Sequence, residues 1–202
     1  YAGLPWFFQF WIRDNAIGIK ALSMVNQDEA CQLLTLLYEA IGEKNPAYRD
    51  LNGNDSLLKG PDGRLFLQWR LKELGICGAF EEHFNDAFVF NDDKETWMDT
   101  ISRKGVRIEL QALKLALLRG TNMEQLFLAK VRKHFLHEQV LIDGVDGNGE
   151  KDFTKRPNIF LAAYIYPELL LPNEWEHTID RHLEALWLSW GGLATIDKGH
   201  TN

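Results

Sequence analysis

Aromatic and charged side chains are concentrated at the start of this 202-residue chain. An aromatic run from Trp6 to Trp11 leads directly into Arg13 and Asp14. Aromatic rings stack on the C–H face of a sugar, and a neighbouring guanidinium and carboxylate bind its hydroxyl groups. A buried amphipathic segment in which Arg13 pairs with Asp14 would have the same composition, because large aromatic residues are most often part of a core. The segment therefore predicts either a carbohydrate contact or a piece of the core.

Four stretches of the chain, taken together, resemble the catalytic domain of glycosidases of the glycogen-debranching, amylo-α-1,6-glucosidase type. The first is the Trp-x-Arg-Asp segment at residues 11–14. The others are residues 95–100 with the following 103–113, residues 155–160 (Lys-Arg-Pro-Asn-Ile-Phe) and residues 190–196 (Trp-Gly-Gly-Leu-Ala-Thr-Ile). They occur in the order in which the family has them, and the likeness covers nearly the whole chain. The resemblance implies hydrolysis of α-glucosidic linkages, such as the α-1,6 branch points of glycogen-like glucans.

The chemistry of such a reaction requires two carboxyl groups on opposite sides of the scissile bond. One is protonated and releases the leaving oxygen, which requires a raised pKa and usually a poorly solvated site. In the inverting form that the resemblance implies, the other carboxylate activates a water molecule. Composition does not show which of the 29 Asp and Glu residues would take these two roles. The candidates are therefore chosen by their position in the sequence and by the resemblance.

Asp62 is the candidate for the general acid. It lies in Gly-Pro-Asp-Gly-Arg-Leu-Phe, at the start of a predicted helix that carries Phe66 and Trp69. In the resembled family an acidic residue just before a comparable helix acts as the acid. That family usually has a small residue and a Trp where this chain has Gly63 and Phe66. An aspartate that only caps the helix would suit the same position, so a structural role is the alternative.

The resemblance also implies a set of substrate-binding residues. Trp11, Arg13, Asp14, Trp97 and Asp99 would hold the sugar, Glu109 and Gln111 would face the substrate from the start of a helix, and Arg156 would shape the pocket. The alternatives are capping or turn residues for Asp99, a solvated helix face for Glu109 and Gln111, and ordinary helix-start chemistry for the Arg-Pro-Asn sequence at 156–158.

The sequence shows no second catalytic carboxylate at the position that the resembled family uses. In the resembled enzymes it lies past the Gly-Gly-Leu-x-Thr segment, and the present sequence stops at Asn202. Either this carboxylate lies beyond Asn202 in a longer protein, or Glu109 or Asp99 would have to substitute for it. The alternative from another class is a non-catalytic protein, either a glycan-binding or a purely structural incomplete toroid. An enzyme with another α-glucoside substrate, as in trehalase-like toroids, is a further possibility.

No metal ion or cofactor is expected. The Asp-Gly-Asn-Gly sequence at 146–149 is similar to part of a calcium-binding EF-hand loop. With Asp146 in the third position, the first ligand position is Gly144 and the twelfth is Lys155, and neither supplies a carboxylate. His134 and His137 are three residues apart but have no partner cluster in the sequence.

The overall composition excludes several classes of partner. A net charge of −7 argues against nucleic acid and against an anionic membrane surface. No stretch approaches the roughly 18 apolar residues of a membrane span. Cys31 and Cys77 have no metal-binding spacing and are expected to be reduced thiols, which favours a cytoplasmic location. The expected partner is an α-glucan or oligosaccharide substrate.

The elements that must position these residues are mostly helices. Apolar residues at helical spacing predict helices at 28–41, 63–75, 80–90, 107–119, 123–136, 158–169 and 175–189, and the same pattern begins near Ile17. Residues 45–61 and 143–157 are rich in Gly, Asn, Asp or Pro and predict loops. Few runs alternate as strands do, so the expected fold is all-α, in a single domain over residues 1–202. The resembled barrel, an (α/α)6 toroid, has a dozen helices, and about eight are expected here, which predicts an incomplete ring of helical hairpins.

Overall fold

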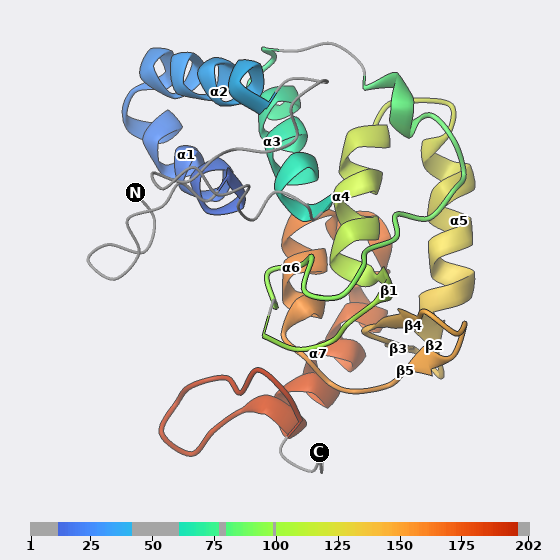
Figure 1. Ribbon diagram of the computed structural model, residues 1–202. Helices are drawn as coiled ribbons and strands as arrows, with labels where there is room; N and C mark the ends of the chain where they lie inside the picture. The colour runs from blue at the N-terminus through green and yellow to red at the C-terminus, as the bar shows by residue number, and fades with distance from the viewer. Residues whose placement is uncertain (1–11, 42–60, 77–79, 99, 198–202) are drawn as a thin grey trace. The chain divides into compact units, whose positions relative to one another are not determined.

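The computed structural model describes residues 12–41, 61–76, 80–98 and 100–197 (Figure 1). These residues form two compact units, each with its own apolar core. The N-terminal unit contains the described residues of 1–81 and 91–103, and the C-terminal unit contains those of 82–90 and 104–202. The expectation of a single domain over the whole chain stays a prediction. Trp11 and Asp99 lie outside the described residues.

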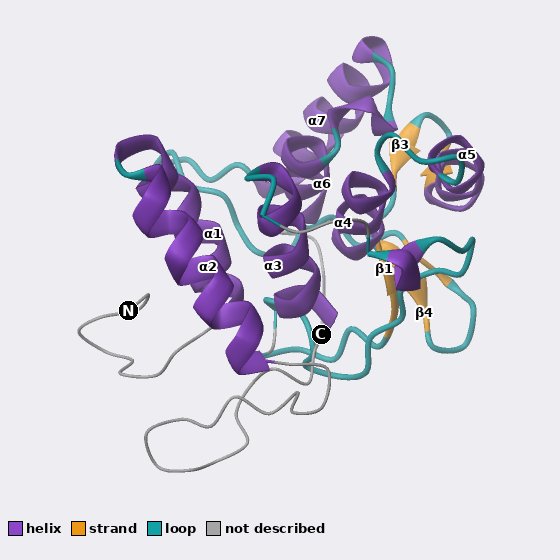
Figure 2. Ribbon diagram, turned by 90° about the horizontal axis from the view of Figure 1, so that it is seen from above, coloured by secondary structure: helices purple, strands orange, loops and turns teal. Residues whose placement is uncertain are grey.

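Three helices make up most of the N-terminal unit (Figure 2). They are α1 (Ile12–Val25), α2 (Gln27–Ile41) and α3 (Pro61–Glu73), and α1 packs against both of the others. The buried apolar residues of α2 are Ala30, Leu34 and Leu37, which are spaced three or four residues apart. The predicted helices at 28–41 and 63–75 are therefore confirmed. The second begins two residues early, at Pro61, because proline fits the first turn of a helix.

Polar contacts connect α1 to α3 at three levels. The Arg13 guanidinium lies 2.9 Å from the Asp62 carboxylate at the start of α3. One turn further along α1, the Ala16 carbonyl accepts a hydrogen bond from Nε of Arg70 (3.1 Å), and then Lys20 pairs with Glu73 (3.3 Å). The residue numbers rise together on the two helices, so α1 and α3 run parallel.

Four helices form the core of the C-terminal unit. They are α4 (Ile108–Leu118), α5 (Glu124–Phe135), α6 (Asn158–Ile165) and α7 (Pro172–Leu186). Every residue of α4 is buried, and α4 packs against α5 and α6, while α6 also contacts α7. The four predicted helices of this region are confirmed, although the third ends at Ile165 and a 3-10 turn (Pro167–Leu169) follows it. None of the described helices is long and apolar enough to cross a lipid bilayer.

Two small antiparallel sheets correct the all-α expectation. The first has the order β1 (Gly105–Arg107), β4 (Gly144–Asp146), β5 (Lys151–Asp152). The second is the hairpin of β2 (Leu136–His137) and β3 (Val140–Leu141). Strands of two or three residues are too short to show an alternating pattern in the sequence. The dominance of helix is confirmed, and the strands, two of which fall in the predicted loop at 143–157, were not foreseen.

Glycine is required where β1 meets β4. Gly105 has φ +133°, and a Cβ there would lie 2.2 Å from the carbonyl oxygen of Val145. A Cβ on Gly144 would lie 2.5 Å from the carbonyl oxygen of Val106. Both contacts are with backbone atoms that are fixed by strand pairing, so a side chain fits at neither position.

The predicted helix at 80–90 is wrong. Only one 3-10 turn (Glu81–His83) forms there. The amide of Ala87 donates to the side chain of Asn85 (3.1 Å), a turn that competes with helix. Further on, the backbone N–H and C=O of Val89 bond to the side chain of Gln111 (2.9 and 2.8 Å). Tertiary hydrogen bonds to α4 therefore hold this segment extended in spite of its apolar pattern.

Lys114 on α4 also binds this segment. Its ammonium donates to Oδ1 of Asn85 (2.8 Å) and to the carbonyl of Ala87 (2.6 Å). It also lies over the ring of Phe127, 4.7 Å from the centroid. Burial disfavours the charged form and lowers the pKa of Lys114 from 10.5 to about 8. Between these two values the unfolded chain holds a proton that the folded chain has released, so stability rises with pH across that window.

The first prediction follows from this buried lysine. We expect the free energy of unfolding of the wild type to increase from pH 8 to pH 10.5 relative to a Lys114→Met variant, which has no proton to lose there. Denaturant unfolding at a series of pH values measures the difference. Lys133→Met, at an exposed position of α5, is the matched control and should follow the wild type. Parallel pH profiles for wild type and Lys114→Met would contradict the prediction.

Candidate functional site

Asp62 is a buried carboxylate inside the first turn of α3. It is the second residue of the helix and only 6% exposed. One carboxylate oxygen accepts the N–H of Gly63 (2.7 Å), and the other lies 2.9 Å from Nη1 of Arg13. Because the helix already begins at Pro61, Asp62 occupies a helical position and not the cap.

Burial and charge act on Asp62 in opposite directions. Burial is the largest influence and raises its pKa, because it disfavours the ionised form. The charge and hydrogen bond of Arg13 and the N–H of Gly63 lower the pKa, while the nearby carboxylate of Asp14 raises it. The net result is a pKa above the ordinary aspartate value of 3.8. A carboxyl group of this kind retains its proton to higher pH than an exposed aspartate does.

Arg13 joins two carboxylates of different exposure. Its guanidinium contacts Asp62 through Nη1 and Asp14 through Nη2, the latter at 3.5 Å. The side chain of Asp14 is 40% exposed, against 8% for that of Asp62. The structure therefore brings three of the predicted site residues together, with one carboxylate open to solvent and the other enclosed.

Trp97 belongs to the same unit as this cluster. It is half-buried in the segment 91–103. Arg103, which is fully buried, donates to Oγ1 of Thr96 (3.0 Å), and its carbonyl accepts the side-chain amide of Asn91 (2.8 Å). The segment is thus held by its own polar contacts.

Glu109 and Gln111 lie in the C-terminal unit and are buried. Glu109 is in the first turn of α4 and 1% exposed, and Gln111 is inaccessible to solvent. A solvated helix face is therefore the wrong interpretation of this pair. The side-chain amide of Gln111 donates to the carbonyls of Val89 and Arg107 (2.8 and 3.0 Å), and its oxygen accepts the N–H of Val89. Gln111 thus supports the backbone that precedes α4.

Arg156 belongs to a buried polar cluster around Asp143. Arg107, Arg156 and Asn158 all approach this carboxylate, at 3.3, 3.5 and 2.5 Å. Arg107 also pairs with Asp152 at 2.7 Å. Nε and Nη1 of Arg156 are buried and have no hydrogen-bond partner within the described part of the chain, so this cation is held by charge and not by a well-formed hydrogen bond.

The sequence interpretation did not single out Arg107, Asp143 or Asp152. Asp143 directly follows two buried apolar residues, and Arg107 directly precedes the wholly buried α4. A charged residue adjoining a buried run is the signal that could have found them, since such a charge requires a partner. The partner itself is 36 residues away along the chain, so spacing could not identify it.

Asp146 stabilises a turn. Its carboxylate accepts the N–H groups of Asn148 and Glu150 (2.8 and 2.9 Å) at the connection of β4 and β5. Among the described residues there is no group of three or more His, Cys, Asp or Glu side chains that could hold a metal ion.

Comparison with known proteins adds no assignment. Neither the family models, nor the curated proteins, nor the solved structures include a match to this chain. Arg13, Asp14, Asp62 and Trp97 lie in the N-terminal unit, and Glu109, Gln111 and Arg156 lie in the C-terminal unit.

The second prediction concerns the buried cluster. We expect Asp143→Ala to destabilise the protein by roughly 3–5 kcal/mol, because it leaves the buried Arg107 and Arg156 without their shared anion. Asp180→Ala, at an exposed position of α7, is the control and should change stability by less than about 0.5 kcal/mol. Urea unfolding of the three proteins measures both effects. Equal midpoints for the two variants would show that the cluster contributes nothing.

Proposed function

We propose that this protein hydrolyses α-glucosidic linkages of glycogen-like glucans, with Asp62 as the general acid of an inverting reaction. The observation that carries the proposal is the buried carboxyl of Asp62, whose pKa is raised although a guanidinium lies 2.9 Å away. General acid catalysis in glycosidases depends on such a carboxyl group. The resemblance of four stretches of the sequence to the amylo-α-1,6-glucosidase type supports the same assignment.

In the proposed reaction, Asp62 donates its proton to the glycosidic oxygen as the bond from this oxygen to the anomeric carbon breaks. A water molecule attacks the anomeric carbon from the opposite face, and a second carboxylate takes the proton that the water loses. Of the two carboxylates that the sequence offers for this second role, Glu109 and Asp99, the latter falls within the sequence range of the unit that contains Asp62. Asp62 ends the reaction ionised, a state that Arg13 stabilises, and is reprotonated from solvent for the next turnover.

The substrate contacts belong to the same proposal. Arg13 and Asp14 offer a donor and an acceptor for sugar hydroxyls, and Trp11 and Trp97 offer aromatic faces. We assign the helices to part of an α/α toroid and place the activity in the cytoplasm, where a free thiol such as Cys31 is chemically stable.

The third prediction is that Asp62→Asn strongly slows turnover while sugar binding persists. The amide is nearly isosteric and can still accept the Gly63 N–H, but it cannot donate a proton to the leaving oxygen. Glucose release from a branched limit dextrin should fall by roughly 10²–10⁴-fold. Asp28→Asn is a matched control, since Asp28 is the second residue of α2, as Asp62 is of α3, but is exposed.

A second substrate separates acid catalysis from structural damage. Fluoride leaves with little protonation, so Asp62→Asn should recover much of its activity on α-glucosyl fluoride. Near wild-type cleavage of the dextrin by Asp62→Asn would show that Asp62 has only a structural role. A wild-type protein that binds the dextrin but releases no glucose would favour the non-catalytic, glycan-binding alternative.

The fourth prediction uses the neighbours of Asp62. The alkaline limb of a kcat/KM profile reports the pKa of the acid in the free enzyme. Arg13 lowers the pKa of Asp62 and Asp14 raises it. Arg13→Gln should therefore move this limb to higher pH, and Asp14→Asn should move it to lower pH and weaken substrate binding. Shifts of the same sign, or no shift in either variant, would disprove Asp62 as the titrating acid.

A further inference from the structure

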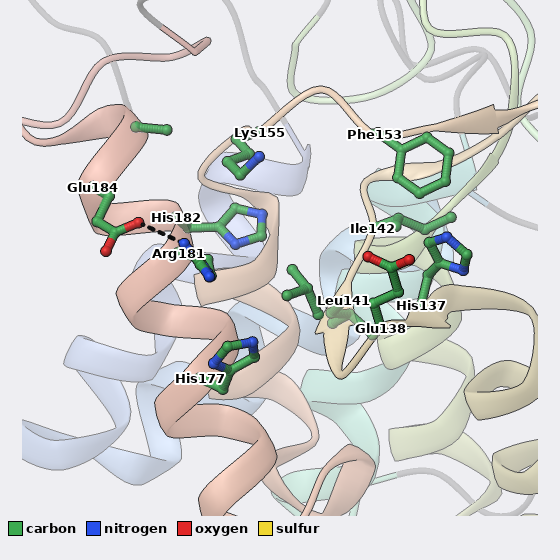
Figure 3. Close-up of a pocket in the computed structure, with 12 residues that line it drawn as sticks. His137, Glu138, Leu141, Ile142, Phe153, Lys155, His177, Arg181, His182 and Glu184 are labelled. Carbon is green, nitrogen blue, oxygen red and sulfur yellow. Dashed lines mark hydrogen bonds and ion pairs between the residues drawn. The ribbon is translucent and has the colours of Figure 1, made fainter.

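A cavity of about 590 Å³ lies within the C-terminal unit. It is bordered by α7, by the β2–β3 hairpin and by Ile142, Phe153 and Lys155 (Figure 3). Its volume falls within the range of small-molecule sites, about 300–1,000 Å³. None of the residues proposed above for catalysis or substrate contact is among those that line it.

The hairpin wall of the cavity is fixed in an unusual conformation. Glu138 and Gln139 at its turn both have left-handed backbone angles (φ 49° and 66°), which a tight two-residue hairpin turn requires. The hydroxyl of Thr178 on α7, itself buried, accepts the N–H of Leu141 (3.2 Å) and donates to the carbonyl of Gln139 (3.4 Å). The hairpin and α7 are therefore joined directly, and the cavity between them is formed in advance of any ligand.

His182 presents a fixed hydrogen-bond acceptor in this cavity. It is 1% exposed, and its Nδ1 lies 2.8 Å from the carbonyl oxygen of Thr178. A carbonyl only accepts, so Nδ1 carries the hydrogen and Nε2 of the neutral ring has a free lone pair. Burial lowers the pKa of His182 and keeps the ring neutral near pH 7. A ligand beside Nε2 must therefore provide a donor, such as a hydroxyl group.

The other charges around the cavity balance. Lys155 and Arg181 are opposed by Glu138 and Glu184. Arg181 and Glu184 pair with each other at 3.3 Å on the exposed face of α7. Lys155, which is half-buried, lies on the same side of the cavity as His182 (Figure 3). The lining thus includes the Lys155 ammonium as a donor and the neutral His182 ring as an acceptor, with Glu138, His137 and His177 as further polar side chains and no excess of charge that would select an ion.

Apolar surface completes the lining. Leu141 and Ile142 are buried at the hairpin side. Phe153 is 52% exposed, and its ring packs against that of His137 with centroids 5.0 Å apart. An exposed aromatic ring beside aliphatic side chains suits the C–H face of a carbohydrate, as paired donors and acceptors suit its hydroxyls.

We propose that this cavity is a binding site for a neutral saccharide of one or two units, with Nε2 of His182 accepting a hydroxyl proton and the ammonium of Lys155 donating to a second hydroxyl. A fully deprotonated inorganic anion such as sulfate is disfavoured, because it has no proton to give to Nε2. The proposal does not depend on hydrolysis at Asp62.

The test is an NMR titration of the full chain with maltose, observing the ring nitrogens of His182. In the wild type, Nε2 of His182 should shift in a saturable way. His182→Leu and Lys155→Met should each weaken maltose binding about tenfold or more, the cost of a lost hydrogen bond. For His182→Leu, whose own ring signal is gone, the ring of the neighbouring His177 reports binding. The leucine leaves α7 intact, because the Thr178 carbonyl keeps its helical partner, the N–H of residue 182.

Controls make each outcome decisive. Lys151→Met, at an exposed position on β5 that does not line the cavity, should bind maltose as the wild type does. Asp62→Asn should also leave the His182 shift unchanged, so failure of the hydrolase proposal and failure of this one are distinguishable. The absence of a saturable shift with maltose, or unaltered affinity in both cavity variants, would overturn the proposal. A saturable shift with sulfate in place of maltose would overturn it in favour of an anion site.

Discussion

Burial of polar groups along α4 is the constraint on which the C-terminal unit depends. A helix with no exposed residue that still carries Gln111 and Lys114 must have partners supplied by neighbouring segments, since unpaired buried polar groups are costly. Residues 82–90 provide backbone oxygens and an amide to these two side chains. At the helix start, Arg107 is matched by the carboxylates of Asp143 and Asp152, which are carried by the β-sheet region. The irregular segments thus take their shape from the helix.

Asp62 and Asp152 each pair with an arginine, and their pKa values move in opposite directions. Asp152 and Asp62 are both affected first by burial, which raises the pKa. At Asp152 hydrogen bonds from Thr154 and the charge of Arg107 outweigh burial, and its pKa is lowered. At Asp62 burial outweighs Arg13, and the neighbouring Asp14 adds repulsion. An ion pair alone therefore does not identify a structural carboxylate, and the balance at Asp62 is the one that suits proton donation.

Helical periodicity allowed most of the fold to be predicted. The helices that became α2, α4, α5 and α7 have apolar residues at three- and four-residue spacing and were found within a few residues of their ends. The helical spacing gave a wrong prediction at 80–90, where hydrogen bonds to the side chain of Gln111 hold the backbone extended. It gave no prediction of the strands, which are too short to show alternating apolar and polar residues. The sequence indicated the pairing of Arg13 with Asp14 but not its ion pair with Asp62, which lies 49 residues away along the chain. The cavity beside His182 was not expected at all, because its wall depends on a hairpin turn of Glu138 and Gln139, which lacks the usual Asn-Gly signal.

The two glycines at the junction of β1 and β4 have a consequence for sequence divergence. Gly105 and Gly144 face backbone oxygens of the opposite strand at distances that no side chain can accommodate. The same strands carry Arg107 and lead from Asp143, so drift at either glycine would separate the charges that neutralise one another in the core. Exposed positions of α5 and α7 can change freely over evolutionary time, whereas these two positions should be kept by purifying selection in any descendant that retains the fold.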